Sequence, residues 1–188
     1  MTQQFEFLEL ELHGAYLITP FTASDERGSF IKDYSHEIFQ LHGINHALQE
    51  VFYTVSHKGV IRAIHFQREK EQPKLVRCIS GEIYDIIVDL RKNSPTFKKW
   101  LGFTLTGANQ KEILIPAGFG HGYMVLQDSI VSYKCAEKFY GECDDGIIWN
   151  DPDLNISWPL AMLGQEIIIS EKDKNLQTFH DYEKTYLI

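Results

Sequence analysis

The fold of this chain is decided by two apolar runs, Gly59-Val-Ile-Arg-Ala-Ile-His65-Phe-Gln67 and Lys74-Leu-Val-Arg77, which a polar loop separates. Side chains along a strand alternate between its two faces, so a strand over the first run places Arg62 and His65 on opposite faces. In the second run, Lys74 shares a face with apolar neighbours. Single polar side chains of this kind are typical of functional positions. They are equally typical of a satisfied buried histidine and of basic side chains whose ends reach water, so the runs alone leave both interpretations open.

Short apolar segments separated by turns continue on both sides of these runs. Gly81-Glu82 is predicted as a hairpin turn, and a bend at 118–122 precedes a second predicted pair of strands, 123–126 and 130–135. A short helix is expected from His36 to His42, and residues 173–188 are expected to be partly helical. The other predicted strands cover residues 5–21, 29–34, 51–56, 74–80, 83–90, 100–106 and 112–116. Many short strands with little helix indicate an antiparallel sandwich or barrel.

The segment Pro116-x-Gly118-x-x-His121 narrows this choice, because it matches the second motif of cupin-type jelly rolls. We therefore predict an all-β fold, a cupin-type jelly roll barrel of antiparallel strands with a few short helices. The chain shows no repeats, linkers or low-complexity tracts. Its 188 residues, 44% of them hydrophobic, suit one domain over residues 1–188.

The composition excludes several classes of function. A net charge of −8 at pH 7 argues against a nucleic-acid surface, which needs a basic patch. The three cysteines are odd in number and lack metal-like spacing, which indicates a reducing compartment. The N-terminus lacks the pattern of a signal peptide, and no segment is long and apolar enough to span a bilayer. We therefore expect a cytoplasmic protein with no membrane partner.

We expect neither a metal nor another cofactor. Cupin metal sites usually combine a His-x-His pair and a Glu with the histidine of the second motif, whereas here His65 lies between Ala63 and Gln67. His65 and His121 alone do not supply the several nitrogen or oxygen ligands that a metal needs. The remaining histidines are expected at the surface, at positions 13, 36, 42, 46, 57 and 180.

The polar residues suit acid–base chemistry at a carbon beside a ketone. A base removes the proton, a donor stabilises the enolate oxygen, and an acid on the opposite face returns a proton with inverted stereochemistry. A histidine titrates near neutral pH and suits the base. The sequence offers His65, Lys74 and Tyr133 for base, enolate donor and acid. Tyr133 is equally compatible with an aromatic residue of the core or of an interface.

These residues lie in blocks that recur in one known family. Besides the two opening runs, the blocks are Asp25-Glu-Arg-Gly28, Val88-Asp-Leu-Arg91 with Ser94-Pro-Thr-Phe97, Ile115-Pro-Ala-Gly-Phe-Gly-His121-Gly, Tyr133-Lys-Cys135, Ile148-Trp-Asn-Asp-Pro152 and Ser170-Glu-Lys-Asp173. In this order they resemble the dTDP-4-dehydrorhamnose 3,5-epimerase family, whose members are nucleotide-sugar epimerases with a jelly roll fold. The ordered set spans most of the chain.

The resemblance implies a cofactor-independent epimerase acting at C3, or at C3 and C5, of a nucleotide-diphosphate 4-keto-6-deoxy sugar for surface polysaccharide synthesis. It assigns the base to His65, the enolate donor to Lys74 and the acid to Tyr133. It also adds Asp173 as the carboxylate that orients His65. Without the resemblance, Asp173 is better interpreted as part of a helix-capping pair with Ser170. Further substrate-binding positions implied by the resemblance are Arg27, Phe30, Arg62, Gln67, His121 and Tyr140.

The chain departs from the family pattern at positions associated with the nucleotide sugar. Ser29 replaces an aromatic residue, Lys32 a common glutamate and Ala63 a glycine. Glu50-Val-Phe-Tyr-Thr-Val-Ser56 stands where the family often has Gln-x-Asn-x-Ser-x-Ser. These changes leave three points open, which are the identity of the nucleotide, whether the sugar is a hexose or a heptose, and the extent of epimerisation. The alternatives are a related 3,4-ketoisomerase and a non-catalytic sugar-nucleotide-binding protein, and the intact acid–base set favours catalysis.

We also expect a homodimer. The apolar and aromatic N-terminal strands would leave sheet edges unpaired, and such edges are commonly covered by a partner. The family that the chain resembles is dimeric as well.

Overall fold

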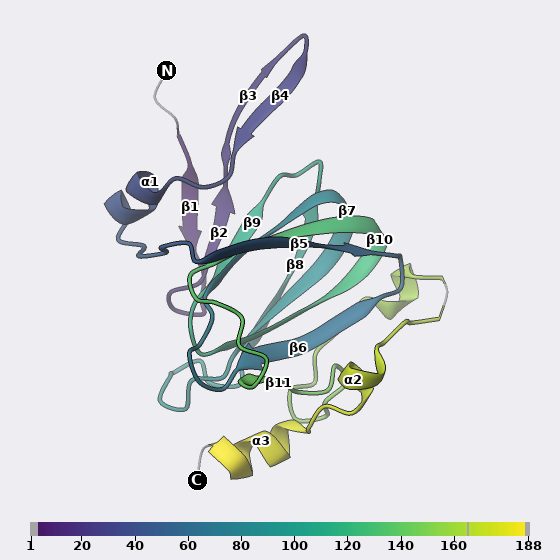
Figure 1. Cartoon of the computed structure of the whole chain (residues 1–188). Helices are drawn as coiled ribbons and strands as arrows, with labels where there is room; N and C mark the ends of the chain where they lie inside the picture. The colour runs from purple at the N-terminus through teal and green to yellow at the C-terminus, as the bar shows by residue number, and fades with distance from the viewer. Residues whose placement is uncertain (1–3, 165, 187–188) are drawn as a thin grey trace.

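The computed structural model describes residues 4–164 and 166–186 (Figure 1). Its strands are β1 (Glu6–Glu9), β2 (Tyr16–Thr19), β3 (Phe21–Asp25), β4 (Gly28–Lys32), β5 (Glu50–Ser56), β6 (Ile61–Gln67), β7 (Lys74–Asp89), β8 (Trp100–Thr106), β9 (Glu112–Ile115), β10 (Phe119–Cys135) and β11 (Asp144–Gly146). Its helices are α1 (His36–Leu41), α2 (Glu171–Lys174) and α3 (Phe179–Tyr186), with a 3₁₀ turn at Leu160–Met162. The predicted all-β class with a few short helices is confirmed.

Two long strands, β7 and β10, run antiparallel to each other through the middle of the sheet. On its other edge, each of these two strands pairs with one strand over its first half and with a different strand over its second half. β7 pairs first with β9 and then with β8. β10 pairs first with β6 and then with β5. The exchange folds the sheet over on itself, so that β5 and β6 belong to opposite walls of the predicted jelly roll (Figure 1).

The two hairpins predicted within these long strands are wrong. β7 is one continuous strand of 16 residues, and β10 is one of 17. At Gly81 the chain bends without turning back. Its φ is +83°, and a Cβ there would lie 2.1 Å from the carbonyl oxygen of Asp128 on β10. Register shifts in β10 between Val125 and Val131 lie opposite this bend. The turn-like residues therefore mark a shared bend of two paired strands.

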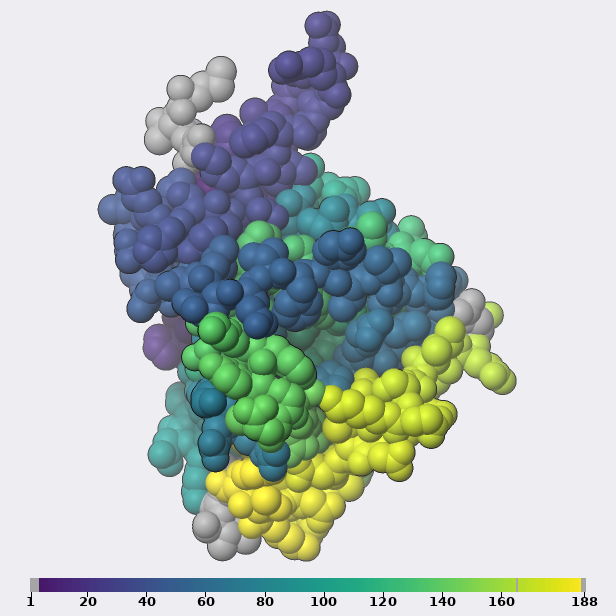
Figure 2. Space-filling view, in the orientation of Figure 1, coloured from purple at the N-terminus to yellow at the C-terminus, as the bar shows by residue number. Residues whose placement is uncertain are grey.

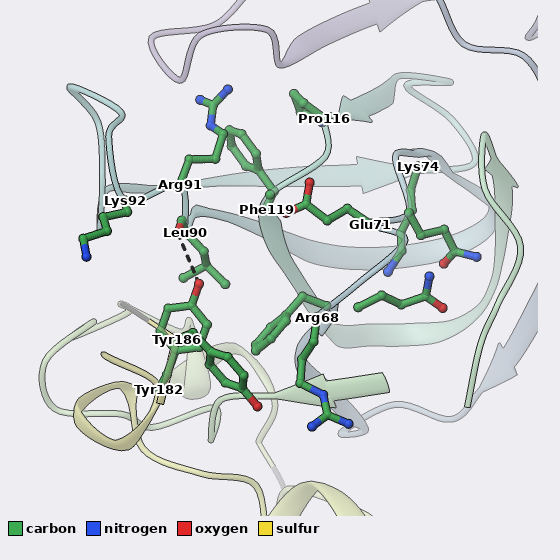
Figure 3. A pocket seen from close by; sticks show the side chains of 14 residues that line it. Arg68, Glu71, Lys74, Leu90, Arg91, Lys92, Pro116, Phe119, Tyr182 and Tyr186 are labelled. Atoms are coloured by element: carbon green, nitrogen blue, oxygen red, sulfur yellow. Dashed lines mark hydrogen bonds between the residues drawn. The ribbon is translucent and has the colours of Figure 1, made fainter. Parts of the chain in front are cut away.

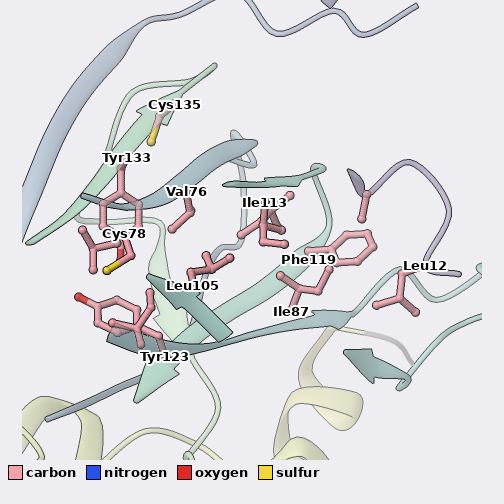
Figure 4. Close-up of a cluster of buried hydrophobic side chains, with 14 of the residues drawn as sticks. Leu12, Val76, Cys78, Ile87, Leu105, Ile113, Phe119, Tyr123, Tyr133 and Cys135 are labelled. Carbon is pink, nitrogen blue, oxygen red and sulfur yellow. The ribbon is translucent and has the colours of Figure 1, made fainter. Parts of the chain in front are cut away.

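Three buried clusters hold these elements together. The first fills the barrel interior, with Tyr123 and Tyr133 at one end of it and Leu12 at the other (Figure 4). The second packs the C-terminal segment onto the opposite face of β6, β7 and β10, with Phe179 of α3 fully buried. The third holds α1 and the N-terminal strands through Phe39. The terminal segments therefore brace the barrel from outside and leave one end of its interior for polar groups.

His46 is an exception to the expectation that the six remaining histidines lie at the surface. It is buried, and its Nε2 donates a hydrogen bond to the backbone carbonyl of Lys134 at 2.9 Å. Burial lowers the pKa of His46, so the ring stays neutral near pH 7. No local pattern around His46 indicates this burial, because its hydrogen-bond partner lies far along the chain, on β10. The other five, at positions 13, 36, 42, 57 and 180, are exposed.

A buried charge cluster joins the N-terminal region to the barrel. Asp33 accepts hydrogen bonds from Arg77 Nη1 at 3.2 Å and from Lys134 Nζ at 2.7 Å. Glu112 of β9 pairs with Arg77 across the strands and is fully buried, and within the described part of the chain neither of its carboxylate oxygens has a hydrogen-bond partner. Burial raises the pKa of Glu112 well above its ordinary value, although Lys134 and Arg77 oppose the rise. Burial therefore favours the neutral, protonated form of the Glu112 carboxyl in the folded protein.

Glu112→Gln is expected to raise the free energy of unfolding at pH 8 and to change it little near pH 4. The unfolded carboxyl ionises above about pH 4.3 while the folded one keeps its proton to a higher pH, so the native chain loses stability as pH rises between the two pKa values. The gain at pH 8 should be about 1–3 kcal/mol, measured by urea denaturation at both pH values. A variant less stable than the native chain at pH 8 would show that Glu112 is ionised and paired.

Candidate active site

A cavity of about 580 Å³ opens between β5, β6 and the segment that carries α2. On the face shown in Figure 2, the surface is hollowed between the dark blue β5 and the yellow C-terminal segment. The cavity brings together seven of the ten predicted site residues, which are Arg62, His65, Gln67, Lys74, His121, Tyr133 and Asp173.

A bulge in β6 brings Arg62 and His65 to the same cavity. His65 pairs with His121 of β10 and Arg62 pairs with Tyr123, so three residue steps on β6 match two on β10. The extra residue reverses the alternation of side chains, and both line the cavity. The expectation that they occupy opposite faces is therefore wrong, because regular alternation holds only along an uninterrupted ladder.

His65 is held by the carboxylate of Asp173. Its Nε2 lies 3.2 Å from Asp173 Oδ2, and the other carboxylate oxygen accepts a hydrogen bond from Ser170 Oγ at 2.9 Å. Burial alone would raise the pKa of Asp173, but the hydrogen bonds from His65 and Ser170 outweigh it and the pKa lies below its ordinary value. Asp173 is thus an anion that fixes the imidazole, and Nδ1 is the ring nitrogen left to take a proton.

Both interpretations of Asp173 are present in this geometry. Ser170 is the N-cap of α2, and its hydroxyl accepts a hydrogen bond from the backbone N–H of Asp173 at 3.0 Å. The backbone of Asp173 therefore completes the helix cap, while its side chain contacts His65.

Asp173→Asn is expected to lower turnover by about 10²–10⁴-fold, because an amide no longer stabilises the protonated imidazole. The fold should persist, since the capping hydrogen bond uses the backbone of residue 173. Steady-state turnover and urea denaturation measure the two effects. Ser170→Ala is the matched control and should cost about 1 kcal/mol of stability with a smaller loss of turnover. If the asparagine variant loses stability and keeps its turnover, Asp173 serves only the helix.

Lys74 reaches the cavity from the start of β7. Burial lowers the pKa of its ammonium group, and Cys135, Asp144 and Asp85 offset this only in part. A second cavity of about 310 Å³ shares Lys74 with the first and lies toward Tyr182 and α3 (Figure 3). Lys74 therefore lies between two hollows, where a desolvated donor is most effective toward a developing oxyanion.

Tyr133 is buried on the opposite wall. Its ring stacks on Phe52 of β5, with the ring centroids 4.8 Å apart and the planes 14° from parallel. Burial raises the pKa of Tyr133 well above its ordinary value, and Tyr123 and Asp85 add to the rise. The hydroxyl therefore carries its proton at neutral pH, as a general acid must.

The sequence prediction missed Asp85. His121 Nε2 lies 2.8 Å from Asp85 Oδ2, and both side chains are almost fully buried. The only available signal was a single carboxylate in the middle of the apolar run that became β7. The pair gives the cavity a second histidine with a fixed ring, 5.9 Å from the ring of Tyr133 between centroids.

Two other predicted residues are tied to the protein itself. Arg62 donates to Ser56 Oγ from Nε at 3.2 Å and from Nη2 at 3.1 Å. The amide of Gln67 donates to the backbone carbonyls of Lys70 and Lys138 and accepts from the N–H of Tyr140. Gln67 therefore holds the loops that border the cavity.

Three predicted residues lie away from the cavity. The ring of Tyr140 lies beneath the ammonium group of Lys70, 3.9 Å from it. Arg27 and Phe30 belong to the β3–β4 hairpin, which projects from the body of the molecule (Figure 1). Arg27 pairs with Asp25, and the ring of Phe30 is exposed.

Within the described residues, no three His, Cys, Asp or Glu side chains are grouped as a metal would require. None of the helices described in the structure is long and apolar enough to cross a membrane. What the cavity does hold is a histidine paired with a carboxylate, a half-buried lysine and a buried tyrosine, all on strands or beside them. The fold and site together define a jelly roll protein equipped for acid–base isomerisation.

Comparison with known proteins identifies the family. The family model for dTDP-4-dehydrorhamnose 3,5-epimerase matches residues 9–181. The epimerase of that name from Methanothermobacter thermautotrophicus is 48% identical over 173 residues, 92% of this chain and 93% of that protein. The Escherichia coli protein of that name is 35% identical over 184 residues, 96% and 98% of the two chains. The structure of a Legionella pneumophila epimerase in complex with dTDP-4-keto-L-rhamnose matches with a TM-score of 0.89 at 34% identity, covering 94% of each chain.

The chain belongs to the dTDP-4-dehydrorhamnose 3,5-epimerase family, as its motifs predicted. It is an isomerase of the nucleotide-sugar epimerase class.

Proposed function

We propose that this chain acts as one domain to invert C3 and C5 of a dTDP-linked 4-keto-6-deoxy hexose, without a cofactor, in the synthesis of a surface polysaccharide. The observation that carries the proposal is the gathering of His65, Lys74 and Tyr133 around one cavity. The names of the relatives support the nucleotide and the sugar.

The walls of the barrel supply the two faces that inversion needs. His65 enters from β6, and Tyr133 from the half of β10 that pairs with β5. His65 Nδ1 takes the proton beside the ketone, and Asp173 stabilises the resulting imidazolium. The ammonium group of Lys74 stabilises the enolate oxygen. Tyr133 then gives its hydroxyl proton to the other face of the same carbon.

The guanidinium group of Arg62 supports an anionic ligand. It lines the same cavity as the acid–base groups, and it donates hydrogen bonds to the hydroxyl of Ser56. A guanidinium matches a diphosphate through paired N–H donors. We assign it to the diphosphate that links the nucleoside to the sugar.

A homodimer would complete this site. One edge of β5 pairs with β10, and the exposed side chains of Val51 and Val55 lie on the same strand. The β3–β4 hairpin carries Arg27 and Phe30 away from the cavity of its own chain (Figure 1). A second copy is the source that would bring these residues to a nucleotide. We expect a dimer by light scattering at micromolar concentration, and a monomer there would contradict this arrangement.

The three cysteines support a reducing, cytoplasmic location. Cys78, Cys135 and Cys143 are buried and unpaired. Free thiols of this kind persist where disulfides do not form.

The substrate assignment is tested with the same 4-keto-6-deoxy-glucose carried on dTDP, GDP and UDP. We expect inversion at C3 and C5, with kcat/KM for the dTDP sugar at least about 10-fold above that for the others. NMR of the product distinguishes this from a 3,4-ketoisomerase, which would move the carbonyl to C3. Turnover of no dTDP sugar would contradict the proposal.

A further inference from the structure

Alternate side chains of β5 support residues that line the cavity. Phe52, Thr54 and Ser56 share one face of this strand by its two-residue period. Each of them contacts one cavity residue on a neighbouring strand. The pairs are Phe52 with Tyr133, Thr54 with Tyr123 at 2.8 Å between the hydroxyl oxygens, and Ser56 with Arg62. The inner face of β5 therefore sets the positions of groups in the site.

Of these pairs, the one between Phe52 and Tyr133 involves the acid itself. The two residues lie directly opposite each other in the ladder of β5 and β10, so their side chains stand on the same face. The ring of His121 meets the same phenol ring from another direction, with the planes 75° apart. His121 is in turn fixed by Asp85. The phenol is therefore held by a parallel ring and by a nearly perpendicular one.

Phe52 is the outer ring of the stack. Its side chain is 40% exposed, whereas that of Tyr133 is 7% exposed. The phenol cannot turn out of its plane without losing this contact. The stack is also particular to this chain, because Phe52 stands where the family that the chain resembles often has an asparagine, which offers no ring.

The orientation of the phenol matters because two groups compete to protonate the enolate. Tyr133 delivers a proton to one face of the carbon and inverts it, while His65 can return its proton to the original face. The choice depends on how closely the Tyr133 hydroxyl approaches the carbon, and a displacement of about 1 Å can cost about 10²-fold in rate.

We propose that Phe52 is a positioning residue that fixes the ring plane of Tyr133, so that the enolate takes its proton from Tyr133 more often than from His65. This rests on the proposed function, in which Tyr133 is the acid. When the new C–H bond forms, either the O–H bond of Tyr133 or the N–H bond of His65 breaks. After an inversion the phenolate gains a proton and the imidazolium loses one, so charge and atoms balance.

The test uses Phe52→Leu, which keeps an apolar side chain and removes the flat ring. The dTDP-linked 4-keto-6-deoxy-glucose is incubated in deuterated water, and NMR measures inverted product and deuterium in the unreacted substrate. The ratio of inverted product to labelled substrate should fall by about 10-fold or more. The sum of the two, which counts enolates formed, should stay at the native value because His65 and Lys74 are unchanged.

Two further variants control for size and fold. Phe52→Trp keeps a flat ring without adding a phenolic hydroxyl, so it should keep the native ratio. Phe52→Met also lacks a ring and should repeat the result of Phe52→Leu, which provides a second variant if the leucine chain does not fold.

A double variant shows whether Phe52 acts through Tyr133. In Tyr133→Phe the ratio is already low, and adding Phe52→Leu should lower it no further, because both changes remove the same proton delivery. A further fall would show that Phe52 acts independently of the hydroxyl and would overturn the proposal.

The remaining outcomes separate this inference from the proposed function. Fewer enolates at an unchanged ratio in Phe52→Leu would show that Phe52 only shapes the cavity or contacts the sugar, and native values of both would show no role. Either result overturns the positioning of Tyr133. If the native chain inverts no dTDP sugar, the proposed function itself fails, and native inversion in Tyr133→Phe would refute the acid assignment together with this inference.

Discussion

His65→Ala is expected to abolish both epimerisation and the exchange of substrate hydrogen for solvent deuterium. His65 is the imidazole that contacts Asp173, and in the proposed mechanism its Nδ1 accepts the proton. Without it the enolate does not form, so exchange stops together with inversion. Loss of a general base and of the imidazolium that follows should reduce both rates by at least about 10³-fold. NMR in deuterated water follows the two rates in one sample.

His57→Ala is the matched control for this variant. His57 is exposed and contacts Asp128 outside the cavity, so both rates should stay at native values. Exchange that persists in His65→Ala would point to another base, and the His121–Asp85 pair would be the first alternative.

Tyr133→Phe is expected to separate the two rates. His65 and Lys74 remain in place, so the enolate still forms and His65 returns deuterium to the original face. The variant should therefore label the substrate at C3 while inverted product falls by about 10²–10⁴-fold, the usual contribution of a general acid. The stacking on Phe52 is kept, because only the hydroxyl is removed.

Native inversion in Tyr133→Phe would show that another donor supplies the proton. Tyr140 does not line the cavity, so a water or Tyr123 would then be the source. Tyr84→Phe is the control and should invert the sugar at the native rate, since it removes a phenolic hydroxyl from the far side of the same sheet.

The fold could be predicted largely from local patterns. Alternating apolar segments located most strands, and Pro116-x-Gly118-x-x-His121 indicated the jelly roll. The errors occurred where pairing with a distant strand determines the course of the local backbone. Gly81 bends a continuous strand because Asp128 of β10 lies against it, and the bulge in β6 reverses the faces of Arg62 and His65. Neither partner is visible in the local sequence.

The site was predicted only in part, because contacts between distant segments place several of its residues. His65, Lys74 and Tyr133 stood out as polar groups within strands, whereas Asp173 lies 108 residues from His65 and came only from the family resemblance. Asp85 and the Thr54–Tyr123 contact depend on cross-strand register, which a single sequence does not specify. Arg27 and Phe30 lie outside the cavity of their own chain, where no strand pattern could place them.

The most direct measurement is the position of deuterium in the product that the native chain forms in deuterated water. The dTDP-linked 4-keto-6-deoxy-glucose is incubated with the protein, and NMR reads stereochemistry and label at C3 and C5. We expect inversion with one solvent deuterium at each inverted carbon, because in the proposed mechanism the proton removed by His65 is not the one that Tyr133 returns. Inverted product without deuterium, or a carbonyl found at C3, would contradict it.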